Sequence, residues 1–277
     1  MTPRIAAQIG PESGGQPEFG IVGRQAGLPP ELPPELAHLR RRVMRSANIA
    51  VDMVEASLDA LWQVDHAVAR SIRGRDDTID AEEIVIEREC LRLLSERPMM
   101  GHDFRLATFC MRINADIERV ADHATSIAKV SMTLDPDEPP QWPTALVELG
   151  DRVPPLCHEL LRAVLDEDTE AARGLVDGDR IIDKMDRCLF DELTAKIERN
   201  ADHAGEALLL FRVGRELERI GDLVASMAEH VVYLVSGEII RHQPRRRARS
   251  SIHRAPGLEP GGQEAPSPKP DPGTATG

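Results

Sequence analysis

The strongest constraint on the fold is an internal repeat that covers most of the chain. Identical residues recur 103 positions apart and, further along, 100 positions apart, the matched pairs including Asp65 with Asp168, Asp76 with Asp179, Asp80 with Asp183, Glu118 with Glu218, Arg119 with Arg219, and Asp122 with Asp222. The change of spacing implies a three-residue deletion in the second copy, and deletions belong in loops. The sequence therefore predicts one structural unit that is used twice.

Apolar residues follow a helical period in both copies. One stripe advances by threes and fours, as an amphipathic helix requires, through Leu36, Leu39, Val43, Ala47, Ala50, Val54, Leu58 and Leu61. Aromatic residues make up only 3% of the chain against 41% hydrophobic residues, which favours helices packed on helices over sheets. The predicted fold class is all-α, with helices over about 35–73, 76–96, 103–132, 144–174, 179–200 and 204–241.

Glycine and proline set the expected boundaries. Gly74 is expected to end the first helix, Pro98 to stop the second, and Pro154-Pro155 to kink or restart the fourth. A proline-rich run before Thr144 cannot continue a helix and separates the two copies. The chain is expected to divide into a disordered tail over 1–34, a first three-helix repeat over 35–132, a linker over 133–143, a second three-helix repeat over 144–242 and a disordered tail over 243–277.

Charge and composition limit the kinds of partner. The formal net charge of −13 disfavours general electrostatic binding of nucleic acid. An arginine-rich run over 241–254 is either a solvated tail or a contact for an acidic protein or an anionic lipid surface. No signal peptide or long apolar segment is evident, so membrane contact is expected only through partner proteins. The four cysteines lack metal-binding spacing and are expected to be reduced core residues, which fits the cytoplasm: Cys90, Cys110, Cys157 and Cys188.

Each copy contains two pairs of acidic residues at a spacing of four, which places both carboxylates of a pair on one helix face. The pairs are Asp76 with Asp80 and Glu118 with Asp122 in the first copy, and Asp179 with Asp183 and Glu218 with Asp222 in the second. Carboxylate oxygens suit Mg²⁺, Mn²⁺ or iron. Glu118 and Asp122 are expected to point away from the core stripe, so any metal site is predicted on the bundle surface. The alternative is that all eight are ordinary solvated charges.

Catalytic signatures are scarce. A di-iron site of the ferritin type would need Glu-x-x-His on two helices, and one such string occurs, from Glu35 to His38. His123, His203 and His230 have no matched histidine in the other copy and are interpreted as surface or interface residues. No phosphate-binding loop or nucleophile elbow occurs. The protein is therefore expected not to be an enzyme.

The repeated motifs resemble those of the PhoU family, negative regulators of bacterial phosphate uptake. The resemblance covers about residues 35–242 and rests on Arg97-Pro98, on Asp103 to Leu106, on Asp116 to Ala124, on Glu216 to Asp222 and on Tyr233 to Gly237. It implies two three-helix bundles side by side, a homodimer, and multinuclear metal clusters held by the eight acidic residues above. The ions implied are iron, magnesium, manganese or zinc.

The same resemblance implies a cytoplasmic adaptor between the ATPase subunit of a phosphate ABC transporter and a sensor histidine kinase. On that hypothesis the protein represses the phosphate-starvation response when phosphate is ample. Two other classes remain open at this point. One is a metal-dependent enzyme or metal store on a helical bundle, and the other is a purely structural helical scaffold in which the acidic pairs are dispensable.

Overall fold

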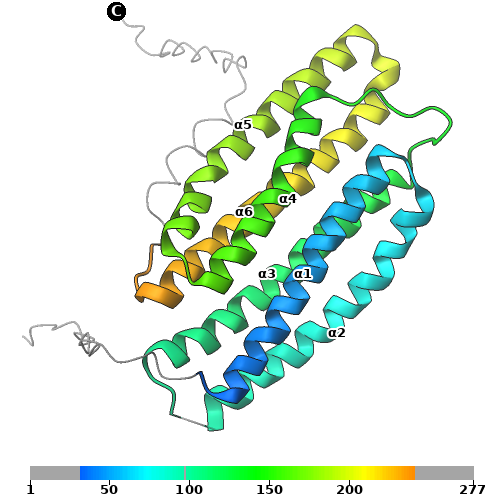
Figure 1. Ribbon diagram of the computed structural model, residues 1–277. Helices are drawn as coiled ribbons and strands as arrows, with labels where there is room; N and C mark the ends of the chain where they lie inside the picture. Colours follow the sequence, from blue (N-terminus) through cyan, green and yellow to red (C-terminus); the bar gives the residue numbers. More distant parts are fainter. Residues whose placement is uncertain (1–31, 97, 241–277) are drawn as a thin grey trace, which may run out of the picture.

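The computed structural model describes residues 32–96 and 98–240, and these residues form helices and connecting loops without strands. The helices are α1 (Pro34–Trp62), α2 (His66–Glu96), α3 (Gly101–Ser131), α4 (Thr144–Asp166), α5 (Thr169–Arg199), the short 3-10 helix η1 (Ala201–His203) and α6 (Ala204–Ser236). Figure 1 shows α1–α3 as one three-helix bundle and α4–α6 as a second bundle beside it. The all-α, duplicated fold predicted from the sequence is confirmed.

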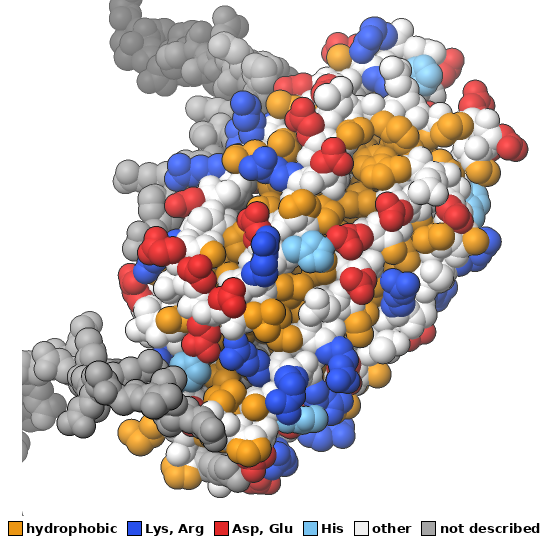
Figure 2. Space-filling model, viewed as in Figure 1, with side chains coloured by type: hydrophobic (Ala, Val, Ile, Leu, Met, Phe, Trp, Pro, Cys, Tyr) orange, Lys and Arg blue, Asp and Glu red, His pale blue; other side chains and the backbone are white. Residues whose placement is uncertain are grey.

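The two bundles pack on each other mainly through α3 and α6. These two helices are in extensive contact, whereas α1 and α4 touch over a shorter stretch. One continuous hydrophobic core runs through both bundles, and it includes Phe109 on α3 and Leu149 on α4. Figure 2 shows apolar side chains at the surface along the middle of one face, between charged side chains of both signs. The third helix of each repeat is therefore packed against its own bundle and against the other repeat.

The repeat is visible in the backbone where the first helix of each bundle meets the second. Val64 has φ 49° and Glu167 has φ 52°, so both occupy the left-handed region that non-glycine residues rarely adopt. The next residue in each copy caps the following helix. Asp65 Oδ1 accepts hydrogen bonds from the amides of Ala67 and Val68 at 2.8 and 3.0 Å, and Asp168 Oδ1 does the same for α5 at 2.9 and 3.0 Å.

These junctions correct two predicted helix boundaries. The first helix ends at Trp62 rather than at Gly74, and the fourth ends at Asp166 rather than near Gly174. Gly74 and Gly174 instead lie inside α2 and α5. An aspartate N-cap contributes about 1 kcal/mol, and a single glycine inside a long helix costs a similar amount. Capping and packing therefore decide the boundary, and the glycine does not.

Of the two outcomes expected at Pro154-Pro155, a kink or a restart of the fourth helix, the restart does not occur, because α4 continues through both residues. The two prolines remove the amide donors that would reach the carbonyls of Gly150 and Asp151. Apolar packing on either side, including the buried Leu149 and Cys157, keeps the helix intact. The sixth helix ends at Ser236, before the predicted Arg241, because Gly237 caps it with φ 75°.

Three cysteines match their prediction and one does not. Cys90, Cys110 and Cys157 are buried, whereas Cys188 is exposed on α5. Burial raises the pKa of the Cys90 and Cys157 thiols to about 12, so they remain protonated near neutral pH.

No helix within the described ranges has both the length and the apolar character needed to cross a bilayer. The predictions for residues 1–31 and 241–277, including the arginine-rich run, concern residues outside the described ranges.

Candidate metal centres

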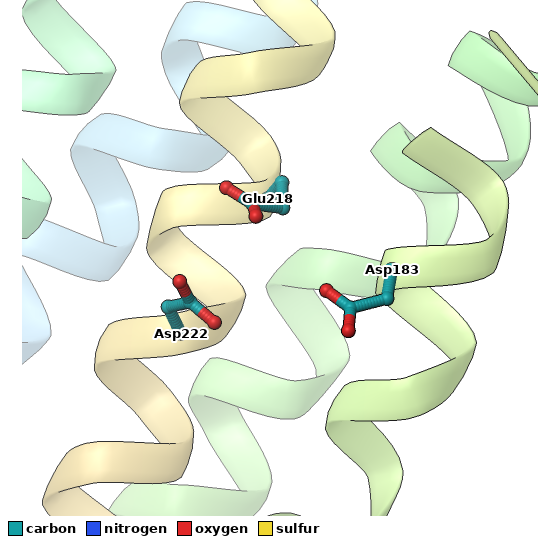
Figure 3. Close-up of side chains that lie close together, drawn as sticks. All are labelled: Asp183, Glu218 and Asp222. Carbon is teal, nitrogen blue, oxygen red and sulfur yellow. The ribbon is translucent and has the colours of Figure 1, made fainter. Parts of the chain in front are cut away.

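A cluster of three carboxylates lies between α5 and α6. One oxygen each from Asp183, Glu218 and Asp222 lies within 4.8 Å of the other two. Glu218 and Asp222 are one helical turn apart on α6, and Figure 3 shows Asp183 projecting toward them from α5. Oxygen ligands bind Mg²⁺ or Ca²⁺ at about 2.0–2.6 Å. Two ligands on opposite sides of one ion are therefore separated by about 4–5 Å, and this cluster already has that spacing.

Burial makes this cluster energetically unusual. Glu218 is 6% exposed, and its Oε2 atom has no hydrogen-bond partner. Burial, followed by the charge of Asp222, raises the pKa of Glu218 above its ordinary value. Asp186 lies one turn beyond Asp183 on α5, and its Oδ1 atom is also buried without a partner. Buried carboxylate oxygens that lack donors are costly, and a bound cation would satisfy them.

We refer to the carboxylates of Asp183, Asp186, Glu218 and Asp222 as the second cluster, because they belong to the second repeat. Arg215 is a positive charge in direct contact with this cluster. Its Nη1 atom lies 3.1 Å from Asp186 Oδ2 and 3.4 Å from Glu218 Oε1. The charges of Glu218, Asp186 and Asp222 outweigh the effect of burial and raise the pKa of the guanidinium. Arg215 therefore compensates part of the negative charge of the cluster through its contacts with Asp186 and Glu218.

The first repeat brings acidic residues together between α2 and α3. Burial and then Asp122 raise the pKa of Glu118 to about 7, and Glu83 and Asp80 add to the effect. Burial, Asp122 and Asp80 likewise raise the pKa of Asp76, whose Oδ1 atom is buried without a hydrogen-bond partner. The four predicted residues of this repeat therefore lie near enough for their charges to interact. Among the described residues, three carboxylate oxygens that lie within 4.8 Å of one another are found in the second repeat and not in the first.

A model described as the PhoU domain matches the chain twice, over residues 43–131 and 146–231, which are the two repeats. The chain belongs to the PhoU family. It is 32% identical over 204 residues to the phosphate-specific transport system accessory protein PhoU homolog of Xylella fastidiosa strain Temecula1, covering 74% of this chain and 85% of that relative. It is 28% identical to the homolog of Pseudomonas putida, covering 79% of this chain and 86% of that relative.

Solved structures agree with this assignment. PhoU from Pseudomonas aeruginosa superposes with a TM-score of 0.70 at 28% identity, covering 74% of this chain and 98% of that one. The phosphate transport system regulatory protein PhoU from Streptococcus pneumoniae gives a TM-score of 0.69 at 25% identity, covering 74% and 97%. The PhoU fold thus extends over both repeats, including both acidic clusters.

The expectation that the acids of this PhoU-family protein lie on an outer surface is only partly right. Asp80 and Asp122 are exposed, but Asp76 and Glu118 are partly covered and Glu218 is buried. The third helix of each repeat has neighbours in its own bundle and in the other bundle, so little of its circumference is free. The acids lie along the line where two helices meet. The backbone of Asp179 belongs to α5, and its side chain lies outside what the structure describes.

Two contributors to the second cluster were missed from the sequence. Asp186 has an acidic counterpart 103 residues earlier, Glu83, so the repeat itself could have identified it. Arg215 had no such signal, because the equivalent residue of the first repeat is Ala115.

His123 lies at the interface between the repeats, which is one of the two positions expected for it. Its Nδ1 atom is 2.7 Å from Glu216 Oε2, which joins α3 to α6. His203 is exposed in η1, whereas His230 is buried, so the surface position considered for His230 is wrong.

Proposed function

We propose that this protein is a regulator of phosphate uptake that represses the phosphate-starvation response, and that it acts without catalysing a reaction. Its relatives are named as accessory proteins of the phosphate-specific transport system, and one solved relative is titled a regulatory protein. We also propose that this regulation depends on bound metal ions, and the observation that best supports metal binding is the environment of the Glu218 carboxylate. Glu218 is 6% exposed, lacks a hydrogen-bond partner on one oxygen, and lies beside Asp183 and Asp222.

The ions are held by oxygen ligands alone on this proposal. Asp183, Glu218 and Asp222 form the second-repeat site, to which the sequence repeat adds Asp179, and the first-repeat site consists of Asp76, Asp80, Glu118 and Asp122. An all-carboxylate set suits magnesium, manganese or iron better than a soft metal, and zinc is the least favoured of the four candidates. A bound cation supplies positive charge between two helices whose carboxylates otherwise repel each other.

The regulatory role follows from the position of the clusters between helices. Carboxylate repulsion pushes α5 away from α6, and α2 away from α3, whereas a shared cation holds each pair at a fixed spacing. We place the protein in the cytoplasm as a homodimer that contacts the ATPase subunit of a phosphate ABC transporter and a sensor histidine kinase. Metal-loaded helix pairs then present rigid faces to these partners, and contact with a membrane is only through them.

A reporter of phosphate-starvation gene expression tests this function. We expect the variant Glu118→Ala/Asp122→Ala/Glu218→Ala/Asp222→Ala to lose repression in phosphate-rich medium. The matched control is Glu198→Ala/Asp202→Ala, which removes an acidic pair with the same spacing of four from an exposed site that has no counterpart in the first repeat. The control is expected to repress normally. Full repression by the fourfold variant at normal protein levels would favour the structural scaffold instead, and turnover of a substrate by the metal-loaded protein would favour the enzyme.

A further inference from the structure

The two acidic clusters are built from equivalent positions but differ in internal charge. Glu83 of the first repeat corresponds to Asp186 of the second, and Arg119 corresponds to Arg219, so these positions carry the same charge in both. One difference that changes the charge in direct contact with the carboxylates lies on the third helix, where the second repeat has Arg215 and the first has Ala115. The second cluster thus contains a positive charge for which the first has no equivalent.

Arg215 lies inside the second cluster rather than at its edge. Its guanidinium bridges α5 and α6 by contacting Asp186 at 3.1 Å and Glu218 at 3.4 Å. These contacts leave Asp186 Oδ1 and Glu218 Oε2 buried without hydrogen-bond partners. A metal ion that approached these oxygens would meet a fixed positive charge only a few ångströms away, and in a partly buried setting that repulsion is large.

The positive charges that act on the first cluster, Arg119 on Glu83 and Lys129 on Asp76, come from exposed side chains. Glu118 and Glu83 lie close enough to feel each other's charge, and Glu87 adds a further negative charge beside Glu83. At the position equivalent to Glu87 the second repeat has the uncharged Phe190. The first repeat does carry Lys129 near Asp76, where the second has Glu229. Lys129 is exposed, and among the ion pairs of the described residues none joins it to the cluster, so solvent screens its charge.

We propose that the guanidinium of Arg215 supplies, in the second cluster, part of the positive charge that a metal ion would otherwise supply. The first cluster therefore binds metal ions more tightly than the second cluster does. This inference rests on the proposed function, since it assumes that both clusters hold metal. It makes the two halves of a duplicated protein unequal. The first repeat is filled at low metal concentration, and the second is filled only when metal is more abundant.

Equilibrium dialysis with Mn²⁺ on the full chain tests the proposal. The variant Asp183→Asn/Asp222→Asn disables the second cluster, so that the affinity of the first can be measured. The variant Asp80→Asn/Asp122→Asn disables the first cluster, so that the affinity of the second can be measured. We expect the first cluster to bind Mn²⁺ at least about tenfold more tightly than the second, because one nearby unit charge is worth more than the 1.4 kcal/mol of a tenfold difference. Equal affinity of the two clusters would overturn the proposal.

Two exchanges at the same position then test the arginine itself. Arg215→Met in the second-cluster background is expected to tighten Mn²⁺ binding about tenfold, and Ala115→Arg in the first-cluster background to weaken it by at least that factor. Lys129→Ala is the control and is expected to change the affinity of the first cluster by less than about threefold. Circular dichroism verifies that each variant is folded, and Ala115→Arg still tests the charge effect if Arg215→Met unfolds.

The outcomes separate this inference from the function on which it rests. No stoichiometric Mn²⁺ in the unmodified protein would overturn the metal-dependent function, and the inference with it. Mn²⁺ binding to both clusters that is unaffected by both exchanges would overturn the inference and leave the proposed function standing.

Discussion

His123 of α3 and Glu216 of α6 form a hydrogen-bonded pair at 2.7 Å between the two repeats. Glu216 is 6% exposed, and Arg219 also approaches it, at 3.5 Å. Burial raises the pKa of Glu216, but the bond and charge of His123 and the charges of Arg219 and Arg212 outweigh it, so the pKa is lowered overall. The interface between the repeats therefore contains a buried carboxylate whose partners come from both of them, His123 from the first repeat and Arg219 and Arg212 from the second.

His123→Ala is expected to reduce the free energy of unfolding by about 1–3 kcal/mol, because it removes a charge-assisted bond and leaves Glu216 buried. Urea unfolding at pH 6 measures the loss. The control is His158→Ala, which breaks the exposed pair of His158 with Glu55 at 2.8 Å and should cost less than about 1 kcal/mol. Equal losses for the two variants would contradict a special role for the buried pair.

The first cluster makes stability depend on pH in metal-free solution. Glu118 has a pKa of about 7 in the folded protein against an ordinary 4.5, so between these values the folded state holds a proton that the unfolded state has released. Stability therefore falls as pH rises from about 4.5 to 7 and then levels off. Glu118→Gln should remove this part of the slope, which thermal unfolding from pH 5 to 8 measures. A variant with the same pH dependence as the parent would show that Glu118 is not protonated near neutrality.

Gly150 is required where α4 passes the ring of Trp62. A Cβ atom at this position would lie 2.6 Å from Trp62 Cζ2, and Trp62 is itself packed edge-on against Trp142 with centroids 4.9 Å apart. Gly150→Ala is expected to destabilise the protein by about 1–3 kcal/mol. Gly74→Ala, in the helix interior with nothing within 4 Å, should instead stabilise it by about 1 kcal/mol. Denaturant unfolding of both variants compares the signs, and stabilisation by Gly150→Ala would contradict the close packing.

Metal is expected to stabilise the folded protein. An ion whose free concentration is 100 times its dissociation constant adds about 2.7 kcal/mol to the free energy of unfolding. Each kcal/mol raises Tm by about 2–4 °C in domains of this size. Saturating Mn²⁺ should therefore raise Tm by roughly 5–10 °C in the unmodified protein. The Glu118→Ala/Asp122→Ala/Glu218→Ala/Asp222→Ala variant should show little change, and an equal rise in that variant would place the ions elsewhere.

The repeat and the helical period predicted the architecture well, because both are properties of the whole chain. The helix boundaries were less accessible. No proline or glycine marks the break at Val64, whose left-handed backbone is uncommon for any side chain and most unusual for a β-branched one. The signal that was present was Asp65, already matched with Asp168 as a repeat pair, which the structure identifies as the N-cap of the second helix.

The sequence was sufficient to predict which acidic residues form the clusters, but not how deeply they are buried or which side chains they contact. Spacing alone placed Glu118 and Asp122 on one face of a helix, and by the same argument Glu218 and Asp222. It could not show that Glu218 would be covered, since its burial depends on how α5 packs against α6. Arg215 was inaccessible for the same reason, because a contact across α5 and α6 leaves no trace in periodicity.

The number of metal ions bound per chain tests the central claim most directly. The measurement is elemental analysis of the protein after dialysis against Mn²⁺ or Fe²⁺, beside the Glu118→Ala/Asp122→Ala/Glu218→Ala/Asp222→Ala variant and the Glu198→Ala/Asp202→Ala control. We predict at least one tightly held ion per repeat in the parent and the control, and near-complete loss in the fourfold variant. A parent protein that retains no metal, or a fourfold variant that retains as much as the parent, would contradict it.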